Sequence, residues 1–331
     1  MPFLSKLNRI YWDLKPFISL RKISQKLNDI NIKKPIFILG TQGGGLTIIS
    51  RILHRHPDTV YCSGNSKFWA SSDEMHQRAF YKLPKVLRLS PPRGSNGVSD
   101  FYNEDLGFYR SFCYASNSLF KNYKLDEDDY IEEDAIIFKN LIREYIRAYS
   151  INKTSSARFV DKSQSYTLKI PWLLKCFPDA KLILVTRNPY ALCKGRSLDI
   201  HLKKLYTSNK KHTSEDLLRI NCEHWKNTYD KALKDLKGRH YLSFKFEDFL
   251  EEPLKFLNPL LNYCELENYE DLLPNKNQKF PAGSISQEKW FPLQKDPNKK
   301  YLDQLSKKEK IIISNIVDNV ASKFQYFPPE I

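Results

Sequence analysis

The run Pro35-Ile-Phe-Ile-Leu-Gly-Thr-Gln-Gly-Gly-Gly-Leu-Thr-Ile-Ile-Ser50 decides the fold of this chain. Ile36 to Leu39 is a short apolar, β-branched stretch, which is typical of a buried strand. After Gly40 the apolar residues return at helical spacing from Ile48 onward. A strand, a glycine-rich turn and a helix in direct succession form a cradle for a phosphate, because glycines allow close approach and the helix start presents unpaired N–H groups.

The spacing of this turn is close to that of the P-loop, G-x-x-x-x-G-K-[ST]. Gly40, Gly45 and Thr47 fit the pattern, but Leu46 stands where the lysine belongs. That lysine neutralises the β- and γ-phosphates of a nucleoside triphosphate. The sequence therefore argues against a triphosphate hydrolase or a P-loop kinase. A turn that merely tolerates glycine is the simpler alternative, although three consecutive glycines are costly without a backbone reason.

The bulk composition is that of a globular protein with an excess of positive charge. The 331 residues are 41% hydrophobic and 27% charged, with a formal net charge of +15. Such a charge suits anionic small molecules, acidic polymers, nucleic acid or an anionic membrane, and lysine-rich solvated faces account for part of it. We expect no nucleic-acid partner, because no RNA- or DNA-binding motif accompanies the charge.

The cysteines indicate a reducing compartment. Six of them are scattered through the chain without a C-x-x-C pair, and several lie in apolar runs. This pattern favours reduced core cysteines and argues against a metal site.

No stretch approaches the length of a membrane span, and the N-terminus lacks the apolar core of a signal peptide. We therefore expect a cytoplasmic protein.

Two regions are expected along the chain. Residues 1–34 form a basic, mildly amphipathic segment, which we interpret as a helix on the surface of the domain. A weak peripheral contact with a membrane is the alternative for this segment. Residues 35–331 are expected to form a single α/β domain with an insertion around 66–155.

Strands and helices are expected to alternate. The patterns predict strands at residues 36–39, 60–62, 158–161, 181–186 and 241–246, and helical segments at 46–54, 105–152, 166–177, from 189, at 214–236 and up to about 263. Acidic residues from Asp126 to Asp134 are typical of a helix start, and we expect the helix that follows to carry Ile137, Leu141, Tyr145 and Tyr149 on one face. Ser306 and Glu309 form a capping box for a last helix. The alternation predicts a three-layer α/β/α fold with a central parallel sheet, P-loop-NTPase-like, with helical additions.

Three polar turns are expected at the carboxyl edge of that sheet, where ligands of such folds bind. They are residues 40–47, Asp161-Lys-Ser163 and Thr186-Arg-Asn-Pro189. An arginine beside a helix start is suited to a dianionic phosphate, because its planar fork donates two hydrogen bonds. The simpler alternatives are a solvated Lys162 paired with Asp161 and a salt-bridged Arg187.

Taken in order, these motifs resemble those of the sulfotransferases that use 3′-phosphoadenosine 5′-phosphosulfate (PAPS). The glycine turn is similar to the family's 5′-phosphosulfate loop, and Leu53-His-Arg-His-Pro57 to its L-x-x-H-P helix end. Val160-Asp-Lys-Ser163 is similar to its E/D-K-[ST]-P turn. Phe177 to Pro189 is similar to F-P-x-A-K-x-I-x-x-x-R-[DN]-P, and Phe244-Lys-Phe-Glu-Asp-Phe249 to Y-E-D-L. The resemblance covers roughly residues 35–260.

The resemblance implies transfer of a sulfuryl group from PAPS to a hydroxyl or amine of a carbohydrate, lipid or small-molecule acceptor. It implies no metal, since protein cations and backbone N–H groups can cover the leaving phosphate. The residues expected to bind the donor are Gly40, Gln42, Gly43, Gly44, Gly45, Leu46, Thr47, Arg187 (on the 3′-phosphate), Ser197 and Lys289.

Three positions depart from the family pattern. Gly43 stands where members have a lysine or arginine, Asn65 where they have an acid or histidine, and Gly195 where they have a serine. We expect Lys162 to replace the missing loop cation, with Lys289 in reserve and Ser197 near the serine position. For the general base we expect Asp73 or Glu74, because a carboxylate can accept the acceptor's proton, with His54, His56 and His76 as alternatives. A catalytically silent relative that binds the nucleotide or another anion is the rival hypothesis.

Overall fold

The computed structural model of the chain describes residues 24–64, 73–89, 113–198, 213–273, 279–280, 289–290 and 295–330, together with Tyr11, Leu14 and Lys15. Most of the basic segment 1–34, Asn65, and residues 66–72 and 90–112 of the insertion predicted around 66–155 lie outside the described residues. Every element below belongs to the described part of the chain.

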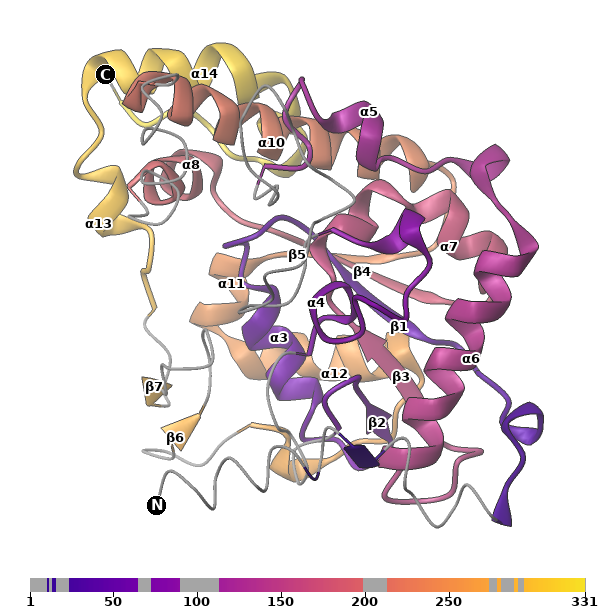
Figure 1. The fold of residues 1–331 in the computed structure, drawn as a ribbon. Helices are drawn as coiled ribbons and strands as arrows, with labels where there is room; N and C mark the ends of the chain where they lie inside the picture. The colour runs from indigo at the N-terminus through magenta and orange to yellow at the C-terminus, as the bar shows by residue number, and fades with distance from the viewer. Residues whose placement is uncertain are drawn as a thin grey trace.

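The centre of the described chain is a five-stranded parallel sheet (Figure 1). Its strand order is β2-β3-β1-β4-β5, and the strands are β1 (Ile36–Leu39), β2 (Thr59–Val60), β3 (Arg158–Asp161), β4 (Lys181–Thr186) and β5 (Leu242–Lys245). β1 pairs with β3 on one side and with β4 on the other, with Ile38 opposite Ile183. The central strand carries only apolar residues because both of its faces are covered. The predicted three-layer α/β fold is confirmed.

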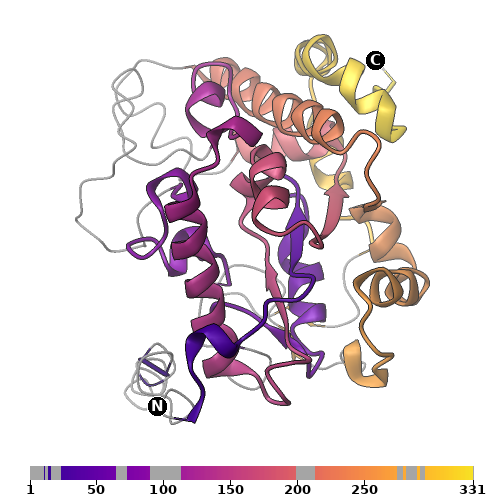
Figure 2. The same cartoon turned by 90° about the vertical axis from the view of Figure 1, so that its right-hand side faces the viewer.

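Alternating side chains of β1 divide the core into two layers. Phe37 and Leu39 face the helices α6 (Glu132–Tyr149), α7 (Ile170–Cys176), α10 (Ser214–Asp235) and α14 (Lys307–Ala321). Ile36 and Ile38 face α3 (Leu46–Leu53), α11 (Phe246–Glu251) and α12 (Pro253–Cys264). Figure 2 shows the sheet between α6 in magenta and α12 in orange.

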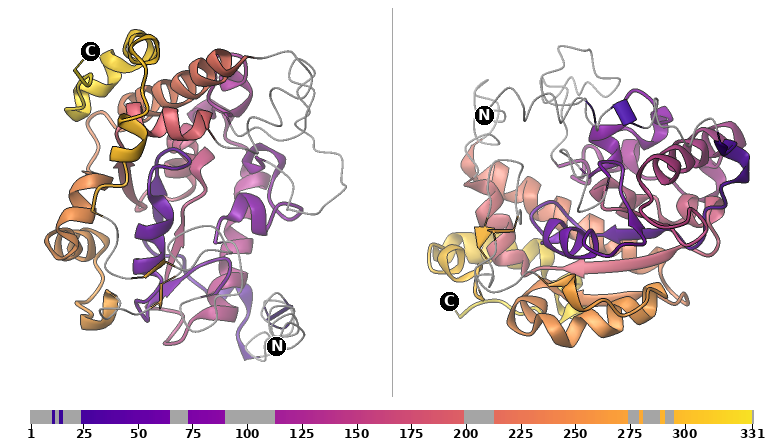
Figure 3. Two further views of the ribbon diagram at one scale, coloured as in Figure 1. Left: turned by 90° about the vertical axis from the view of Figure 1, so that its left-hand side faces the viewer. Right: turned by 90° about the horizontal axis from the view of Figure 1, so that it is seen from below.

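The other elements surround these layers. α8 (Pro189–Ser197) begins with its proline in the first turn, and the Asn188 side chain caps it by accepting from Ala191 N at 3.1 Å. Figure 3 shows α10 beside α14 at one end of the molecule. The short elements are α4 (Met75–Arg78), α5 (Phe120–Tyr123), α13 (Lys299–Leu302), η1 (Leu27–Asp29), η2 (Lys85–Leu87), η3 (Glu127–Asp129), η4 (Gln164–Leu168), η5 (Glu270–Leu272), η6 (Ser322–Phe324), and the antiparallel pair β6 (Lys279–Phe280) and β7 (Lys289–Trp290).

Several expected elements need correction. The second strand ends at Val60, and Tyr61 makes only a single bridge with Gly64. The helix expected at 166–177 is two pieces, η4 and α7, because Lys169 leaves helical geometry at φ −130°. The single helical region at 105–152 contains α5, η3 and α6 with turns between them, and residues 105–112 are not described.

The buried face of α6 is also shifted. Ile137 is 46% exposed, whereas Ala135, Phe138, Ile142 and Ile146 are buried. A row of residues four apart drifts about 40° around the helix at each step, because a turn takes about 3.6 residues. Ile137 is three such steps from Tyr149, so it leaves the buried face.

Other local predictions are confirmed. Ser306 and Glu309 form the capping box of α14, and the acidic residues Glu132, Glu133 and Asp134 occupy the first turn of α6. Among the described helices, none combines the length and the apolar character needed to cross a bilayer.

Gly45 allows a test of the contact between the glycine loop and the Phe246 ring of α11. It caps α3 at φ +92°, and a Cβ at this position would overlap the ring of Phe246. Gly45→Ala should therefore lower the free energy of unfolding by about 2–4 kcal/mol in urea denaturation, from backbone strain and steric overlap.

The matched control is Gly238→Ala. Gly238 has φ +74°, and among the described residues no heavy atom would lie within 4 Å of its Cβ. Its loss should be limited to the left-handed backbone cost of about 1 kcal/mol. Equal losses in the two variants would contradict a special role for the Phe246 contact.

Candidate active site

The glycine loop, residues 40–47, connects β1 to α3 and is held from both sides. Gly40 N donates to Thr167 Oγ1 at 2.8 Å, and Thr41 N donates to the Tyr229 hydroxyl at 3.4 Å. Tyr229 in turn donates to Val185 O at 2.8 Å. The loop is thus tied to η4 and α10 by hydrogen bonds within the protein.

The glycine loop has Leu46 at the position where a P-loop has its lysine, so only backbone groups face a ligand there. Leu46 is 4% exposed, and its side chain packs in the core with α11 and α12. A Cβ on Gly44 would lie 2.9 Å from Thr41 O, so a side chain there would distort the turn. At the start of α3 the N–H groups of Leu46 and Thr47 have no acceptor within the helix. These groups, with the positive end of the helix dipole, can hold an anion.

Arg187 lies on the glycine loop. Its Nη1 donates to Gly43 O at 2.8 Å, its Nε donates to Asn298 Oδ1 at 2.9 Å, and its guanidinium carbon lies 5.6 Å from the Phe246 ring centre. Burial lowers the pKa of Arg187, and Glu247 opposes that change. The guanidinium remains a cation at neutral pH. Within the described part of the chain, the oxygens that accept hydrogen bonds from Arg187 are neutral, and no ion pair of Arg187 is found there.

Glu247 organises this corner. Its Oε1 accepts from Asn188 N at 2.9 Å and from Asn298 Nδ2 at 2.5 Å, and its Oε2 accepts from the Tyr326 hydroxyl at 2.8 Å. Glu247 therefore positions the turn that carries Arg187 and also the amide that contacts Arg187.

At Gly195, where the family pattern has a serine, a side chain would press against Tyr301. A Cβ on Gly195 would lie 3.1 Å from the Tyr301 ring, which covers α8 at this point. Ser197 is 5% exposed, and its hydroxyl donates to Lys194 O at 2.8 Å. Its hydroxyl is thus engaged inside α8. Gln42, the other polar side chain predicted in the loop, accepts from Arg196 Nη2 at 3.1 Å.

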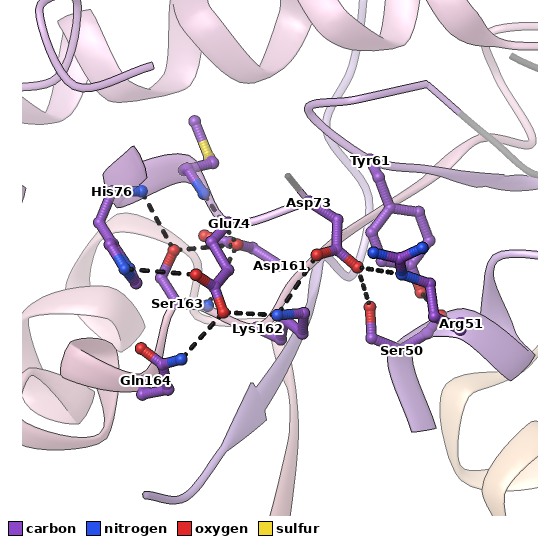
Figure 4. Close-up of polar contacts among 11 residues, drawn as sticks. Ser50, Arg51, Tyr61, Asp73, Glu74, His76, Asp161, Lys162, Ser163 and Gln164 are labelled. Carbon is purple, nitrogen blue, oxygen red and sulfur yellow. Dashed lines mark hydrogen bonds and ion pairs between the residues drawn. The ribbon is translucent and has the colours of Figure 1, made fainter. Parts of the chain in front are cut away.

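Lys162, Asp73 and Glu74 meet in a buried ionic cluster with Arg51 (Figure 4). Lys162 Nζ lies 3.3 Å from Asp73 Oδ1 and 2.5 Å from Glu74 Oε1. Arg51 Nε lies 3.1 Å from Asp73 Oδ2. All four residues are between 2% and 6% exposed. Lys162 is therefore not a solvated turn residue, and the predicted cation and the two predicted bases form one unit.

The two carboxylates of the cluster differ in their surroundings. Burial opposes the ionisation of Asp73, but Lys162 and Arg51 outweigh it and hold the pKa of Asp73 below its usual value. Asp73 also accepts from Ser50 Oγ at 2.8 Å. A carboxylate with so low a pKa is a weak base. Glu74 accepts from Gln164 Nε2 at 2.9 Å, and its second oxygen lies 3.5 Å from His76 Nε2.

Asp161, which precedes Lys162, pairs with neutral groups. Its Oδ1 accepts from Ser163 Oγ at 3.0 Å and from Met75 N at 3.3 Å, while its Oδ2 has no partner among the described residues. Burial raises the pKa of Asp161 to about 7 against these donors. Burial also lowers the pKa of His76 to about 4, so its ring is neutral at physiological pH.

The remaining predicted residues lie in other surroundings. His54 stacks on Tyr61 with ring centres 4.0 Å apart, and His56 Nε2 lies 3.0 Å from Glu267 O. Lys289 belongs to β7, whose backbone alone is described. Within the described ranges, no group of three histidines, cysteines or carboxylates has a geometry that could hold a metal.

Sequence patterns missed three residues around the glycine loop: Tyr229, Glu247 and Arg196. Glu247 lies in a motif that we noted, but nothing in it indicated a contact with Asn188. Arg196 lies four residues after Leu192 in α8, and both side chains approach Gly43. The spacing of four residues, which puts Leu192 and Arg196 on the same side of a helix, is the one sequence signal that could have linked them.

Comparisons with known proteins identify the family and the fold of this chain. A model of the sulfotransferase family matches residues 35–271. The fold is similar to the sulfotransferase domain from the curacin biosynthetic pathway, with 16% identity, 90% of this chain and 100% of that chain covered, and a TM-score of 0.53. It is similar to sulfotransferase STF9 from Mycobacterium avium, with 14% identity, coverage of 92% and 80%, and a TM-score of 0.54.

A third similar structure is the sulfotransferase domain from the Synechococcus PCC 7002 olefin synthase, with 17% identity, coverage of 92% and 99%, and a TM-score of 0.52. At these identities the likeness concerns the fold. An uncharacterized protein of Aquifex aeolicus (strain VF5) is 23% identical over 261 residues, which is 77% of this chain. The match spans 28% of that relative's length.

The buried carboxyl of Asp161 predicts a loss of stability as the pH rises. Its folded-state pKa of about 7 lies above the ordinary value of 3.8, so the folded protein keeps a proton that the unfolded chain releases. The stabilising contribution is complete below the ordinary value and is lost as the pH rises to the folded value.

Asp161→Asn keeps an acceptor oxygen for Ser163 and removes the ionisation. The free energy of unfolding of the variant minus that of the wild type should increase by on the order of 1 kcal/mol per pH unit. This increase is expected between pH 3.8 and about 7, the ordinary and the folded-state pKa of Asp161. Urea denaturation at a series of pH values measures this difference. A difference that does not change with pH would show that Asp161 ionises normally in the folded protein.

Proposed function

We propose that this chain, which belongs to the sulfotransferase family, transfers a sulfuryl group from PAPS to a hydroxyl or amine of a carbohydrate, lipid or small-molecule acceptor. The observation that carries the proposal is the hydrogen bond from Arg187 Nη1 to Gly43 O at 2.8 Å. It joins two predicted phosphate sites that lie far apart in the sequence. A donor with phosphates at both its 3′ and 5′ positions suits such a pair.

The backbone of the glycine loop is proposed to bind the 5′-phosphosulfate. The N–H groups at the start of α3 are suited to this anion because they donate without needing a charged side chain. Arg187 is proposed to bind the 3′-phosphate with its guanidinium fork. The Phe246 ring and Asn298 hold that fork in place.

The reaction needs positioning more than covalent chemistry from the protein. The acceptor oxygen or nitrogen forms a bond to sulfur in line with the bond that breaks, from sulfur to the 5′-phosphate oxygen. The leaving 3′-phosphoadenosine 5′-phosphate (PAP) keeps the electron pair of that bond. The transition state is loose, as in phosphoryl transfer, so fixed donors and cations stabilise it. The acceptor's proton passes to a base.

Glu74 is our choice for that base. Asp73 accepts from Ser50, Arg51 and Lys162 and has a low pKa, which makes it a poor proton acceptor. Glu74 is held by Lys162 and Gln164 on one oxygen. Lys162 then acts as a positioning residue, because it orients Glu74 and balances its charge.

The proposal is tested by binding and transfer measurements on the wild type. Titration calorimetry should show binding of PAP, and radiolabelled PAPS should give a labelled product with extracts of the protein's own cell. Absence of nucleotide binding would overturn the proposal. Binding of PAP without transfer to any of a broad acceptor panel would favour the silent, nucleotide-binding relative.

Gly44→Val tests the glycine loop in the same assay. Its side chain would meet Thr41 O and distort the turn, so PAP binding should weaken by at least about tenfold, which is about 1.4 kcal/mol. Circular dichroism confirms that the variant is folded. Unchanged binding in a folded variant would place the donor elsewhere.

Glu74→Gln tests the choice of base. The amide keeps the size of the side chain but cannot accept a proton, so kcat should fall by about 10²- to 10⁴-fold while PAP binding is unchanged. A kcat equal to that of the wild type would exclude Glu74 as the base.

Lys162→Ala separates turnover from donor binding. Turnover should be lost and much of the PAP binding kept. The free energy of unfolding should fall by about 3–5 kcal/mol, because two buried carboxylates lose their common partner. Turnover and PAP binding are therefore measured well below the unfolding temperature of the variant, so that its lower stability does not affect them. Full activity in this variant would contradict a role for Lys162 in positioning Glu74.

A further inference from the structure

Gly43 lies at the exposed tip of the glycine loop, where a charged side chain would reach a bound anion. A Cβ built on Gly43 would lie 3.5 Å from Arg196 Cδ and 3.9 Å from Leu192 Cγ. The side chains of α8 therefore lie against the loop at the point where a side chain of residue 43 would begin. Gly43 has no side chain of its own to compete for this space.

Arg196 reaches the loop from α8. Its Nη2 donates to Gln42 Oε1 at 3.1 Å, and the aliphatic part of its side chain lies next to Gly43. Pro189 and the Asn188 cap fix the start of the helix, so the approach of Arg196 is set by a regular element. Five N–H donors in a planar fork match the oxygens of a phosphate or sulfate group.

Two buried donors lie at α10, the helix that packs against α8. His224 is 3% exposed, and its Nδ1 accepts from Ala115 N at 3.1 Å, which leaves the ring proton on Nε2. Among the described residues, neither His224 Nε2 nor the hydroxyl of Tyr114 has a partner. The two rings are 4.5 Å apart in an edge-to-face arrangement.

Both rings are held in their neutral forms. Burial, together with the smaller effect of the Arg196 charge, lowers the pKa of His224 to about 3, so the ring is a neutral donor at physiological pH. Burial raises the pKa of Tyr114, and Arg196 opposes that rise. A buried donor without an acceptor destabilises the folded protein.

We propose that Arg196 supplies, from helix α8, the cation that Gly43 leaves absent from the glycine loop, and that it contacts the 5′-phosphosulfate of the donor. This inference rests on the proposed function and deepens it. When the bond between sulfur and the 5′-phosphate oxygen breaks, negative charge grows on that oxygen. A guanidinium fixed beside it stabilises the transition state more than the ground state.

The test is a ligand truncation measured by calorimetry. PAP carries both phosphates, adenosine 3′-phosphate lacks the 5′-phosphate, and adenosine 5′-phosphate lacks the 3′-phosphate. Arg196→Ala should weaken PAP and adenosine 5′-phosphate by about 10- to 100-fold, as for loss of one charge-assisted contact. It should leave adenosine 3′-phosphate unchanged.

Arg187→Ala is the matched comparison and should show the opposite pattern, with loss of PAP and adenosine 3′-phosphate binding and unchanged adenosine 5′-phosphate. Arg239→Ala removes an exposed arginine at the end of α10 and should change none of the three. Arg196→Lys should keep a large part of the affinity, whereas Arg196→Gln should behave like the alanine variant, because charge and not packing is at issue.

The outcomes separate the two proposals. If the wild type binds PAP but Arg196→Ala weakens PAP and adenosine 3′-phosphate equally, or neither of them, Arg196 does not contact the 5′ group and the inference is wrong. Wild-type affinity in Arg196→Gln also overturns it. If the wild type binds no PAP, the proposed function itself fails.

Discussion

The contact of the Phe246 ring with Gly45 is the constraint on which the site depends. The ring fills the space where a side chain of residue 45 would stand, and Arg187 lies over the same ring. Glu247, the next residue, binds the backbone of Asn188 and the amide of Asn298. One corner of α11 thus fixes the glycine loop, the turn after β4 and the orientation of Arg187. The glycine at position 45 is needed for packing as much as for backbone freedom.

The charges around the glycine loop fall into two kinds of environment. In the ionic cluster, Arg51 and Lys162 face Asp73 and Glu74 in a buried region, and their formal charges cancel. The contacts of Arg187 and Arg196 with the loop are made to neutral oxygens. An uncompensated carboxylate would be very costly at this depth, which explains the pairing. The positive charge on the loop is suited to a polyanionic donor, and Glu74 is the member of the ionic cluster that we propose as the base for the acceptor's proton.

Much of the fold follows from local patterns. The apolar runs of β1 and β4, Pro189 at the start of α8 and the capping box at Ser306 were predicted at their observed places, because each depends on residues adjacent in sequence. The errors lie where packing overrides a pattern. Ile137 leaves the buried face of α6, and Lys169 divides a predicted helix. The order of motifs led to the family, which the match over residues 35–271 confirms.

The sequence by itself determined the strand-turn-helix cradle, the parallel sheet and the edge at which the polar turns meet. It also identified Lys162, Asp73 and Glu74 as separate candidates, but it could not show that they neutralise one another. Only the tertiary structure decided those ion pairs and the approach of Arg196 to Gly43. The physical reason is that these contacts join residues more than eighty positions apart in the chain. Their geometry depends on how whole helices and loops pack against the sheet, which no local spacing encodes.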